Sequence, residues 1–414
     1  MSVILNEVKD LGRVRDPSAL PQNDLGDTRT KMANIFISVD EHVQENPEVW
    51  TKRLSRARWG DRIPHLEKNS DGTEQWIVDG RQIELDGVAD CGAAMPDRTR
   101  NPRRWSEVPA SVYDPKERLK VMDAAGIDHA VLYPTVAGSG GQNFGRIEDA
   151  ELELACVQAY NDWLMEEWVS VSDRFIPQCL TPLFPIDAAV EEIRRAVKNG
   201  HRGVIYPSVP MELRDVPHVN DSIYDPLWTA CQELGVPICF HAGASAAIQI
   251  PAYEGYSPTI AAASQAITRP ASTVSVLVNL LISKILMRFP SLKVVLAESG
   301  LGWGAYLLEY TDFQATGDQL PQNGYDLMPS ELFRRSCYLV GWYDQASLRV
   351  RSYIGTDNIL WSTQFPLATS TWPNTQAALA KSFDAIDEVD RRKILWQNAA
   401  RLYKISEIEQ AEKP

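Results

Sequence analysis

The chain is short of positive charge. Its 414 residues include 41 Lys and Arg against 55 Asp and Glu, which gives a formal net charge of −14 at pH 7. A nucleic-acid-binding surface needs a basic face to meet the phosphates, and an anionic membrane surface attracts basic segments for the same reason. The charge balance therefore argues against nucleic acid and against a membrane surface as partners.

Long hydrophobic runs and paired cysteines are also missing. No apolar stretch reaches the roughly 18 residues of a membrane-spanning helix. The first segment, MSVILNEVKDLGRVRD, mixes charges through its only apolar run, which argues against a secretory signal. The six cysteines form no Cys-x-x-Cys pair, which argues against a zinc knuckle or a redox motif. We therefore expect a cytoplasmic protein.

What the sequence does contain is eight short apolar runs, most of them separated by helical patterns. They are NIFISVDEH (from Asn34), HAVLYPT (from His129), FIPQCLTPLF (from Phe175), RGVIYPS (from Arg202), VPICFHAG (from Val236), LKVVLAESG (from Leu292), SCYLVGW (from Ser336) and NILWSTQ (from Asn358). Each run is nearly continuous, as expected of a strand that is buried on both faces. Eight such strands alternating with helices predict an α/β protein with the (β/α)8 barrel fold, whose chemistry lies at the carboxyl ends of the strands.

One segment between the first two strands does not fit this repeat. Residues 43–115 are rich in Trp, Arg, Pro and Gly in their first part and include EKNSDGTEQWIVDGRQI, which predicts a small hairpin with an Asp-Gly turn. Because the segment leaves the end of the first strand, we expect it to cover the barrel mouth as a cap. Residues 1–33 lack a clear period and are expected to be a loose extension, so the barrel domain is expected over residues 34–405.

Three helical patterns bear on the fold and on assembly. Residues 187–200 and 221–235 each begin with Asp, show apolar spacing of three and four, and end with Gly. Residues 272–290, STVSVLVNLLISKILMRFP, predict a longer helix that is apolar on most sides. Such a helix is typical of an interface between domains or subunits, and it suggests a homodimer.

Metal-binding and acidic side chains stand at the ends of several predicted strands. The first strand ends in Asp40 and His42, the fifth in His241, the sixth in Glu298 and the eighth in Gln364. In an extended chain residues i and i+2 point to the same side, so Asp40 and His42 can bind one ion together. His241 would be the third ligand, and Glu298 would be a fourth ligand or a neighbour of the ligands. Imidazoles with carboxylates suit Zn²⁺, Mn²⁺ or Fe²⁺.

The remaining candidates differ in where the predicted barrel places them. Tyr206, not a lysine, ends the fourth strand, so a bridging carbamylated lysine is absent and one divalent metal ion is expected rather than two. His218 follows the fourth strand and either reaches the substrate or lies at the surface. Trp59 in the cap and Trp303 after the sixth strand are further candidates for contact with the substrate.

With these residues in place, the chain resembles the amidohydrolase-related family (amidohydrolase 2). The similarity is to the branch that includes aminocarboxymuconate-semialdehyde decarboxylase and the resorcylate-type decarboxylases. It runs from about Asn34 to Tyr403 and is carried by SVDEHVQENPEVW, RLKVMDAAGIDHAVLYPT, AYNDWL, YDPLWTACQELGVPICFHAG, LKVVLAESGLGWGAYLLEYTD and DNILWSTQFPLATSTWPNT. The resemblance implies one divalent metal and either non-oxidative decarboxylation or hydrolysis of C–N or C–O bonds, in many members on aromatic or ring-derived acids.

The eighth strand departs from the family pattern. The family typically reads Ser-Asp-Tyr/Phe-Pro-His there, whereas this chain reads Thr363-Gln364-Phe365-Pro366-Leu367. The resemblance implies that the Asp binds metal and handles a proton. Glutamine can offer an amide oxygen to a metal but carries no charge and cannot act as a base. Either reaction would then need a substitute, and Glu298, Glu41, Glu45 and His218 are the groups expected near the mouth.

Three functions follow from these patterns. The first is a metal-dependent enzyme acting on a small carboxylated or aromatic compound, with Glu298, His241 and Gln364 as catalytic candidates. Decarboxylation is favoured for it because the water-activating Asp is missing. The second is a metal-dependent hydrolase that uses Glu298 as its base. The third is a non-catalytic or metal-free relative, which the glutamine at position 364 would explain.

Overall fold

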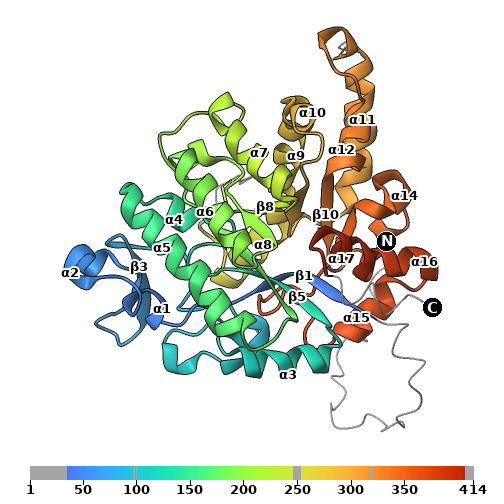
Figure 1. Ribbon diagram of the computed structural model, residues 1–414. Coiled ribbons are helices and arrows are strands. Elements are labelled where there is room, and N and C mark those ends of the chain that lie inside the picture. Colours follow the sequence, from blue (N-terminus) through green and yellow to red (C-terminus); the bar gives the residue numbers. More distant parts are fainter. Residues whose placement is uncertain (1–34, 97, 99, 246–252, 318–319, 406–414) are drawn as a thin grey trace, which may run out of the picture. The chain divides into compact units, whose positions relative to one another are not determined.

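Eight parallel strands form the centre of the structure, a computed structural model that describes residues 35–96, 98, 100–245, 253–317 and 320–405. Each strand pairs with the next in the order β1-β5-β6-β7-β8-β9-β10-β11, and helices surround them (Figure 1). The strands are β1 (Ile37–His42), β5 (His129–Tyr133), β6 (Phe175–Leu180), β7 (Gly203–Ile205), β8 (Ile238–His241), β9 (Val294–Ala297), β10 (Cys337–Gly341) and β11 (Ile359–Trp361). Every one of them lies within a predicted run, so the prediction of a (β/α)8 barrel is confirmed. The extension predicted for residues 1–33 lies outside the described residues.

The first and last strands meet through side chains and loop backbone. The Thr363 amide donates to Ser38 Oγ at 2.9 Å, and the His42 amide donates to the Phe365 carbonyl at 2.8 Å. These bonds bring the end of β1 beside the residues that follow β11. The loop that carries Gln364 and the strand end that carries His42 therefore lie on the two sides of one seam of the barrel.

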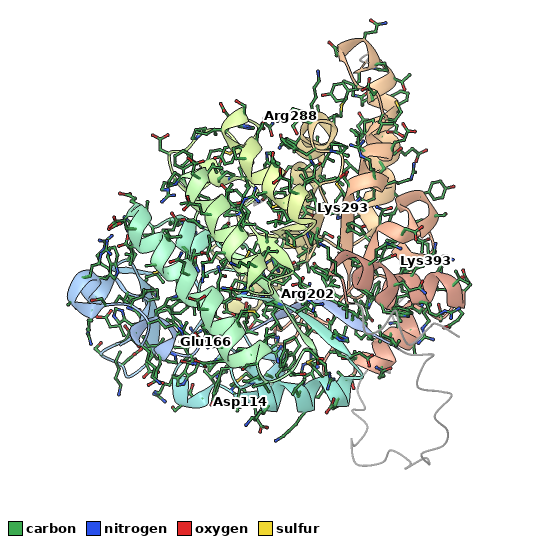
Figure 2. The ribbon with its side chains drawn as sticks, in the orientation of Figure 1. Asp114, Glu166, Arg202, Arg288, Lys293 and Lys393 are labelled. Atoms are coloured by element: carbon green, nitrogen blue, oxygen red, sulfur yellow. The ribbon has the colours of Figure 1, made fainter. Side chains whose placement is uncertain are left out.

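The helices follow local capping signals. The Asp114 side chain, labelled in Figure 2, accepts from the amides of Lys116 and Glu117 and begins α3, and Gly126 ends it in the left-handed conformation (φ 70°). The longer helices are α3 (Pro115–Ala125), α5 (Ala150–Trp163), α6 (Ile186–Lys198), α7 (Asp225–Leu234), α8 (Pro258–Thr268), α9 (Ser272–Ile282), α11 (Gly302–Gly317), α12 (Pro329–Ser336) and α15 (Thr375–Ser382). The chain's last described helical stretch runs through α16 (Glu388–Arg392), the π-helical turn η12 (Lys393–Gln397) and α17 (Asn398–Leu402).

The predicted long helix over residues 272–290 is wrong as a single element. The chain forms α9 and then α10 (Ile285–Arg288), with Lys284 between them in the left-handed conformation at φ 66°. A left-handed residue cannot continue a right-handed helix, so the direction changes there. Leu277 and Leu281 of α9 are fully buried, whereas Val278 and Ile282 are 37% exposed. The helix thus packs much of its apolar surface inside its own chain.

The predicted hairpin forms and gains a third strand. β2 (His65–Lys68) pairs antiparallel with β3 (Glu74–Val78), and β3 pairs antiparallel with β4 (Arg81–Gln82). Two short helices precede this sheet, α1 (Glu48–Thr51) and α2 (Arg56–Trp59). Beyond the sheet, Val88, Cys91 and Val112 form a small apolar cluster with Phe365, which follows β11. The insertion is therefore attached to the loop after the last strand.

A buried histidine before a barrel strand gives the fold a pH dependence. His201 precedes β7, its Nδ1 lies 3.0 Å from the Ala196 carbonyl oxygen, and its Nε2 has no hydrogen-bond partner among the described residues. Burial lowers the pKa of His201 from 6.5 to about 4. The folded state keeps the imidazole neutral, whereas the unfolded chain binds a proton near its ordinary pKa of about 6.5. Stability is therefore fully present above that value and is lost as the pH falls towards 4.

We expect His201→Gln to reduce this acid sensitivity. A shift of about 2.5 units corresponds to about 3 kcal/mol of unfolding free energy between neutral pH and pH 4. The measurement is urea unfolding of wild type and variant at pH 7.5 and pH 4.5. The loss of unfolding free energy on acidification should be smaller in the variant. An equal loss in both proteins would show that His201 does not become protonated on unfolding.

Candidate metal centre and active site

The ends of β1 and β8 bring three side chains together inside the barrel mouth. Asp40 and His42 project to the same side of β1, as their spacing predicts, and Glu41 between them turns the other way and accepts from the Ser38 hydroxyl. Asp40 Oδ1 lies 3.3 Å from His42 Nε2 and 3.4 Å from His241 Nε2. One ligand atom from each of Asp40, His42 and His241 lies within 4.8 Å of the others.

These three residues fit one divalent cation. Asp40 Oδ1, His42 Nε2 and His241 Nε2 are all buried, and none has a hydrogen-bond partner among the described residues. Buried polar atoms are nearly always satisfied, so three unsatisfied atoms that converge on one point need a common partner. Two imidazole nitrogens and one carboxylate oxygen form a donor set that suits Zn²⁺, Mn²⁺ or Fe²⁺.

Neighbouring groups orient each of these atoms. His241 Nδ1 lies 3.0 Å from the Ala242 carbonyl oxygen, to which it can only donate, and this leaves the Nε2 lone pair free. The second oxygen of Asp40 accepts from the Glu298 amide at 3.0 Å. The rings of His42 and His241 meet edge to face, with centroids 5.2 Å apart. The geometry is therefore held by the protein itself.

The charged groups of the cluster shift one another's pKa values. Burial alone would raise the pKa of Asp40, but the adjacent His241 and His42 hold it well below its ordinary value. Burial lowers the pKa of His241, and Asp40 and Glu298 outweigh that effect and raise it. Asp40 is thus kept as a carboxylate, which is the form that binds a cation.

Glu298 lies beside this cluster, at the end of β9. Its Oε2 is 3.7 Å from His241 Nδ1, and its Oε1 is 3.6 Å from Arg269 Nη1. Its backbone is left-handed, with φ 50°, so the chain turns sharply at the strand end. Burial raises the pKa of Glu298, although Arg269 and His241 act in the opposite direction.

Gln364 is fully buried and has the same left-handed backbone, with φ 57°. Its Oε1 accepts from the Thr369 hydroxyl at 2.8 Å, and its Nε2 has no partner among the described residues. The amide oxygen that could serve a metal is therefore engaged by Thr369. The sequence pattern held no signal for this contact, because it depends on how the loop after β11 folds back.

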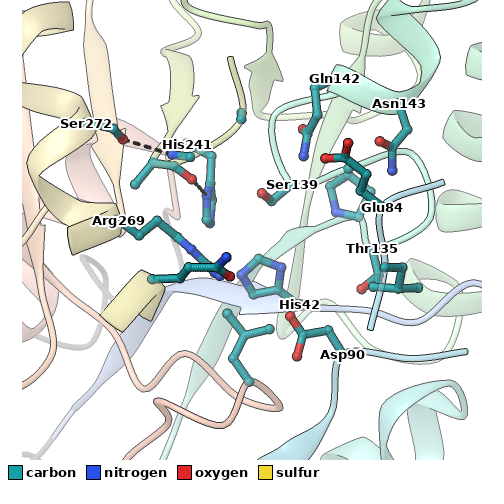
Figure 3. A pocket seen from close by; sticks show the side chains of 18 of the residues that line it. His42, Glu84, Asp90, Thr135, Ser139, Gln142, Asn143, His241, Arg269 and Ser272 are labelled. Carbon is teal, nitrogen blue, oxygen red and sulfur yellow. Dashed lines mark hydrogen bonds between the residues drawn. The ribbon is translucent and has the colours of Figure 1, made fainter. Parts of the chain in front are cut away.

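A cavity of about 470 Å³ opens above the cluster, and its lining is mostly polar. His42 and His241 lie in its wall (Figure 3). The other side chains that give it chemical character are Glu84, Asp90, Gln142, Asn143, Arg269 and Ser272. Glu84 and Asp90 come from the insertion, and the other four residues lie in the helical elements α4 (Gln142–Gly145), η9 (Arg269–Ala271) and α9, so the strand-end rule gave no signal for any of the six. Leu367, which replaces the family histidine, also lines the cavity.

The three predicted substrate contacts lie elsewhere. Trp59 is buried in the insertion, with Arg58 over its ring at 4.3 Å. His218 is exposed, and its Nδ1 accepts from the Asn220 amide. Trp303 donates to the Ser299 carbonyl at 2.8 Å. Within the described part of the chain, none of these three residues lines the cavity that contains His42 and His241.

Two acids proposed as substitutes for the missing aspartate are engaged in other contacts. Glu41 accepts from the hydroxyls of Ser38 and Thr363. Glu45 accepts from the amides of Thr135 and Val136, and burial raises its pKa to about 7. Neither Glu41 nor Glu45 is among the described residues that line the cavity.

A barrel with a cluster of residues that could hold a metal ion at its mouth is typical of one class of protein, the metal-dependent hydrolase and lyase barrels. The sequence profile of one family in that class, described as amidohydrolase, matches residues 81–405. The chain belongs to the amidohydrolase family, and the predicted family is confirmed.

Several of the known proteins to which this chain is similar are decarboxylases of aromatic acids. A gamma-resorcylate decarboxylase of Rhodococcus jostii (strain RHA1) is 28% identical over 320 residues, which cover 73% of this chain and 91% of that protein. The structure of an amidohydrolase from Mycobacterium avium subsp. paratuberculosis K-10 matches with a TM-score of 0.70 and 23% identity, over 89% of this chain and 99% of that one. A dihydroxybenzoic acid decarboxylase from Polaromonas sp. JS666, with bound manganese and 2-nitroresorcinol, matches with a TM-score of 0.62 and 20% identity, over 92% and 100%. The decarboxylase relatives support an enzyme with carboxy-lyase chemistry.

Proposed function

We propose that this protein removes CO₂, without oxidation, from a small aromatic or ring-derived carboxylic acid, with one divalent metal ion held by Asp40, His42 and His241. One observation carries the proposal above the others. Three buried, unsatisfied metal-ligating atoms converge beneath a polar cavity, while the position after β11 holds a glutamine that cannot activate water. The named activities of the decarboxylase relatives support the same reaction.

The chain's own residues can bind and orient such an acid. A metal ion at the cluster supplies positive charge that attracts substrate oxygens and withdraws electrons from the bond that breaks. Arg269, in the cavity wall, offers a guanidinium to a carboxylate or a phenolic oxygen. Gln142 and Asn143 offer amide groups to ring hydroxyls from the opposite part of the lining in Figure 3. We propose Mn²⁺, Zn²⁺ or Fe²⁺ as the metal, with manganese favoured by the Polaromonas structure.

Hydrolysis with Glu298 as the base is the second candidate, because this acid lies 3.7 Å from His241 and its pKa is raised by burial. Decarboxylation is favoured because Glu298 is not among the described residues of the cavity wall, so a water molecule in the cavity would not meet it. A non-catalytic relative has no physical need for three converging ligand atoms.

The test is metal content and CO₂ release. The purified protein is analysed by plasma mass spectrometry without added metal, and the Mn²⁺-loaded protein is incubated with 2,6-dihydroxybenzoate and other ortho-hydroxybenzoates. About one metal ion per chain, with CO₂ release from one of these acids, supports the proposal. Metal binding with a hydrolytic product and no CO₂ would establish the hydrolase instead. Failure to bind metal after reconstitution would favour the non-catalytic relative.

Gln364→Asp is expected to tighten Mn²⁺ binding at least about tenfold, equivalent to about 1.4 kcal/mol. The substitution adds a carboxylate to the loop after β11, whose backbone is hydrogen-bonded to β1, the strand that carries Asp40 and His42. Isothermal titration with Mn²⁺ measures the change, and Gln364→Asn serves as the neutral control. An unchanged affinity in the aspartate variant would mean that position 364 does not face the ion.

Two further expectations stay predictions. Among the described residues, no helix is long and apolar enough to cross a membrane. We propose a cytoplasmic location on the charge and composition of the chain, and a homodimer on the exposed apolar positions Val278 and Ile282 of α9. Sedimentation of the purified protein tests the second proposal.

A further inference from the structure

A decarboxylase must deliver a proton to the carbon that loses CO₂, and Gln364 carries no acidic proton. We infer that Asp90, a carboxylate of the insertion, is the general acid of this site. The inference rests on the proposed decarboxylase function. It names the residue that replaces the acid missing from position 364, in the loop after β11. No sequence pattern identifies Asp90, because it lies outside the strand ends.

Few carboxylates of the described chain can reach a substrate in the cavity. Glu41 and Glu45 are engaged in buried hydrogen bonds outside the cavity, and Glu298, whose Oε2 is 3.7 Å from His241 Nδ1, is not among the described residues that line it. Of the acidic residues in the described chain, only Glu84 and Asp90 line the cavity that holds His42 and His241. These two carboxylates therefore have access to a bound acid that the other candidates lack.

Asp90 and Glu84 differ in their place in the cavity wall and in their exposure. In Figure 3 the Asp90 and His42 side chains are drawn in the same part of the cavity wall, and Glu84 is drawn in the part that contains Asn143 and Thr135. Glu84 is exposed, while Asp90 is half-buried. A proton donor must be held near the reacting carbon, and water competes less with a half-buried group. Of the two acids in the cavity wall, Asp90 is the less exposed and therefore the better candidate.

Asn101 holds the Asp90 side chain in place. Asn101 donates through Nδ2 to Asp90 Oδ1 at 3.2 Å and accepts through Oδ1 from the Cys91 amide at 3.1 Å. One oxygen of Asp90 is thus fixed by a donor.

The same segment rests on the loop that departs from the family. The Ala93 amide donates to the Pro366 carbonyl at 3.0 Å. A Cβ on Gly92 would lie 2.9 Å from the Ala368 Cβ, so only glycine allows this close approach. Asp90 and Leu367 line one cavity. The insertion thus contributes a carboxylate to the same cavity wall as the loop after β11, in which Gln364 and Leu367 stand where the family pattern has ionisable residues.

The step balances without any further reactant. Protonated Asp90 gives its proton to the ring carbon that bears the carboxylate, and a C–H bond forms. The C–C bond to the carboxylate then breaks, its electron pair returns to the ring, and CO₂ leaves. Asp90 is left as a carboxylate and takes a proton from solvent, so one acid anion and one proton become the decarboxylated ring and CO₂.

The experiment compares Asp90→Asn with Asp90→Glu and with Asp86→Asn in the Mn²⁺-loaded protein. Asp86 is an exposed carboxylate of the same segment, paired with Arg103 and outside the cavity. CO₂ release from the ortho-hydroxybenzoate that the wild type accepts is followed against pH, with Mn²⁺ affinity and thermal unfolding measured in parallel.

We expect Asp90→Asn to lower kcat by about 10²- to 10⁴-fold, with Mn²⁺ affinity and unfolding temperature unchanged. Asp90→Glu should retain part of the activity, and Asp86→Asn all of it.

A kcat within about threefold of wild type in Asp90→Asn would overturn the inference about Asp90 but would leave the proposed function standing. Lost metal or lowered stability in that variant also overturns the inference, because Asp90 would then be structural. A wild type that binds metal but releases no CO₂ overturns the proposed function, and the inference with it.

Discussion

His241→Ala is expected to abolish metal retention and CO₂ release while the barrel stays folded. His241 supplies one of the three converging ligand atoms, and its other nitrogen is fixed by the Ala242 carbonyl. Loss of a residue that merely supports a metal ligand typically weakens metal binding about 10- to 100-fold, so loss of the ligand itself should exceed about 100-fold. Asp40 and His42 alone would not retain the ion through purification.

The measurement is metal content by plasma mass spectrometry, together with CO₂ release and thermal unfolding. His65→Ala is the matched control, because His65 lies in β2 of the insertion and its Nδ1 contacts the Ile63 carbonyl, away from the cavity. The control should keep its metal and its activity. Metal and turnover that survive in His241→Ala would remove this histidine from the site.

Arg118→Met is expected to destabilise the fold by about 3–5 kcal/mol, the range for a buried ion pair that loses one partner. Arg118 is fully buried, and its Nη1 lies 3.7 Å from Glu41 Oε2. It also donates to the carbonyls of Ser111 at 2.8 Å and His42 at 2.6 Å, and its guanidinium lies 4.6 Å from the centre of the Phe365 ring. One side chain thus joins the insertion, the end of β1 and the loop after β11.

A double substitution separates the charge from the other contacts. Arg118→Met leaves the Glu41 carboxylate buried without a cation, and Glu41→Gln in the same chain removes that charge. The double variant should therefore recover part of the lost unfolding free energy, as measured by urea titration. A double variant that is less stable than Arg118→Met would show that the carboxylate does not need the guanidinium. Burial lowers the pKa of Arg118 to about 10, so the guanidinium is charged at neutral pH.

The barrel was predictable from the sequence because buried parallel strands have a simple pattern. A strand covered on both faces must be apolar along its length, and all eight barrel strands of the described chain lie in such runs. The three converging ligand atoms followed from the same logic, since Asp40, His42 and His241 end strands that meet at one mouth. The break of the predicted helix at Lys284 did not follow, because no glycine or proline marks it.

The cavity wall was less predictable than the metal ligands. Asp90 and Glu84 come from the insertion, and their place depends on contacts such as Ala93 with Pro366, which join residues far apart in the chain. Tryptophans suggested contacts with the substrate, yet Trp59 packs inside the insertion and Trp303 donates to a nearby carbonyl. Side-chain type alone does not tell whether an aromatic ring fills a core or faces a ligand.

The seam between β1 and the residues after β11 has a consequence for how the protein is made. The bond between Thr363 and Ser38 joins residues separated by 325 positions. During synthesis the first strand leaves the ribosome long before its last neighbour exists, and contacts between such distant residues close late in folding. Until then the end of β1, with two of the three proposed ligands, lacks the loop whose Phe365 carbonyl accepts from the His42 amide. Newly made chains should therefore acquire the proposed metal ion after translation ends, and a chain that stops before residue 363 should not hold it.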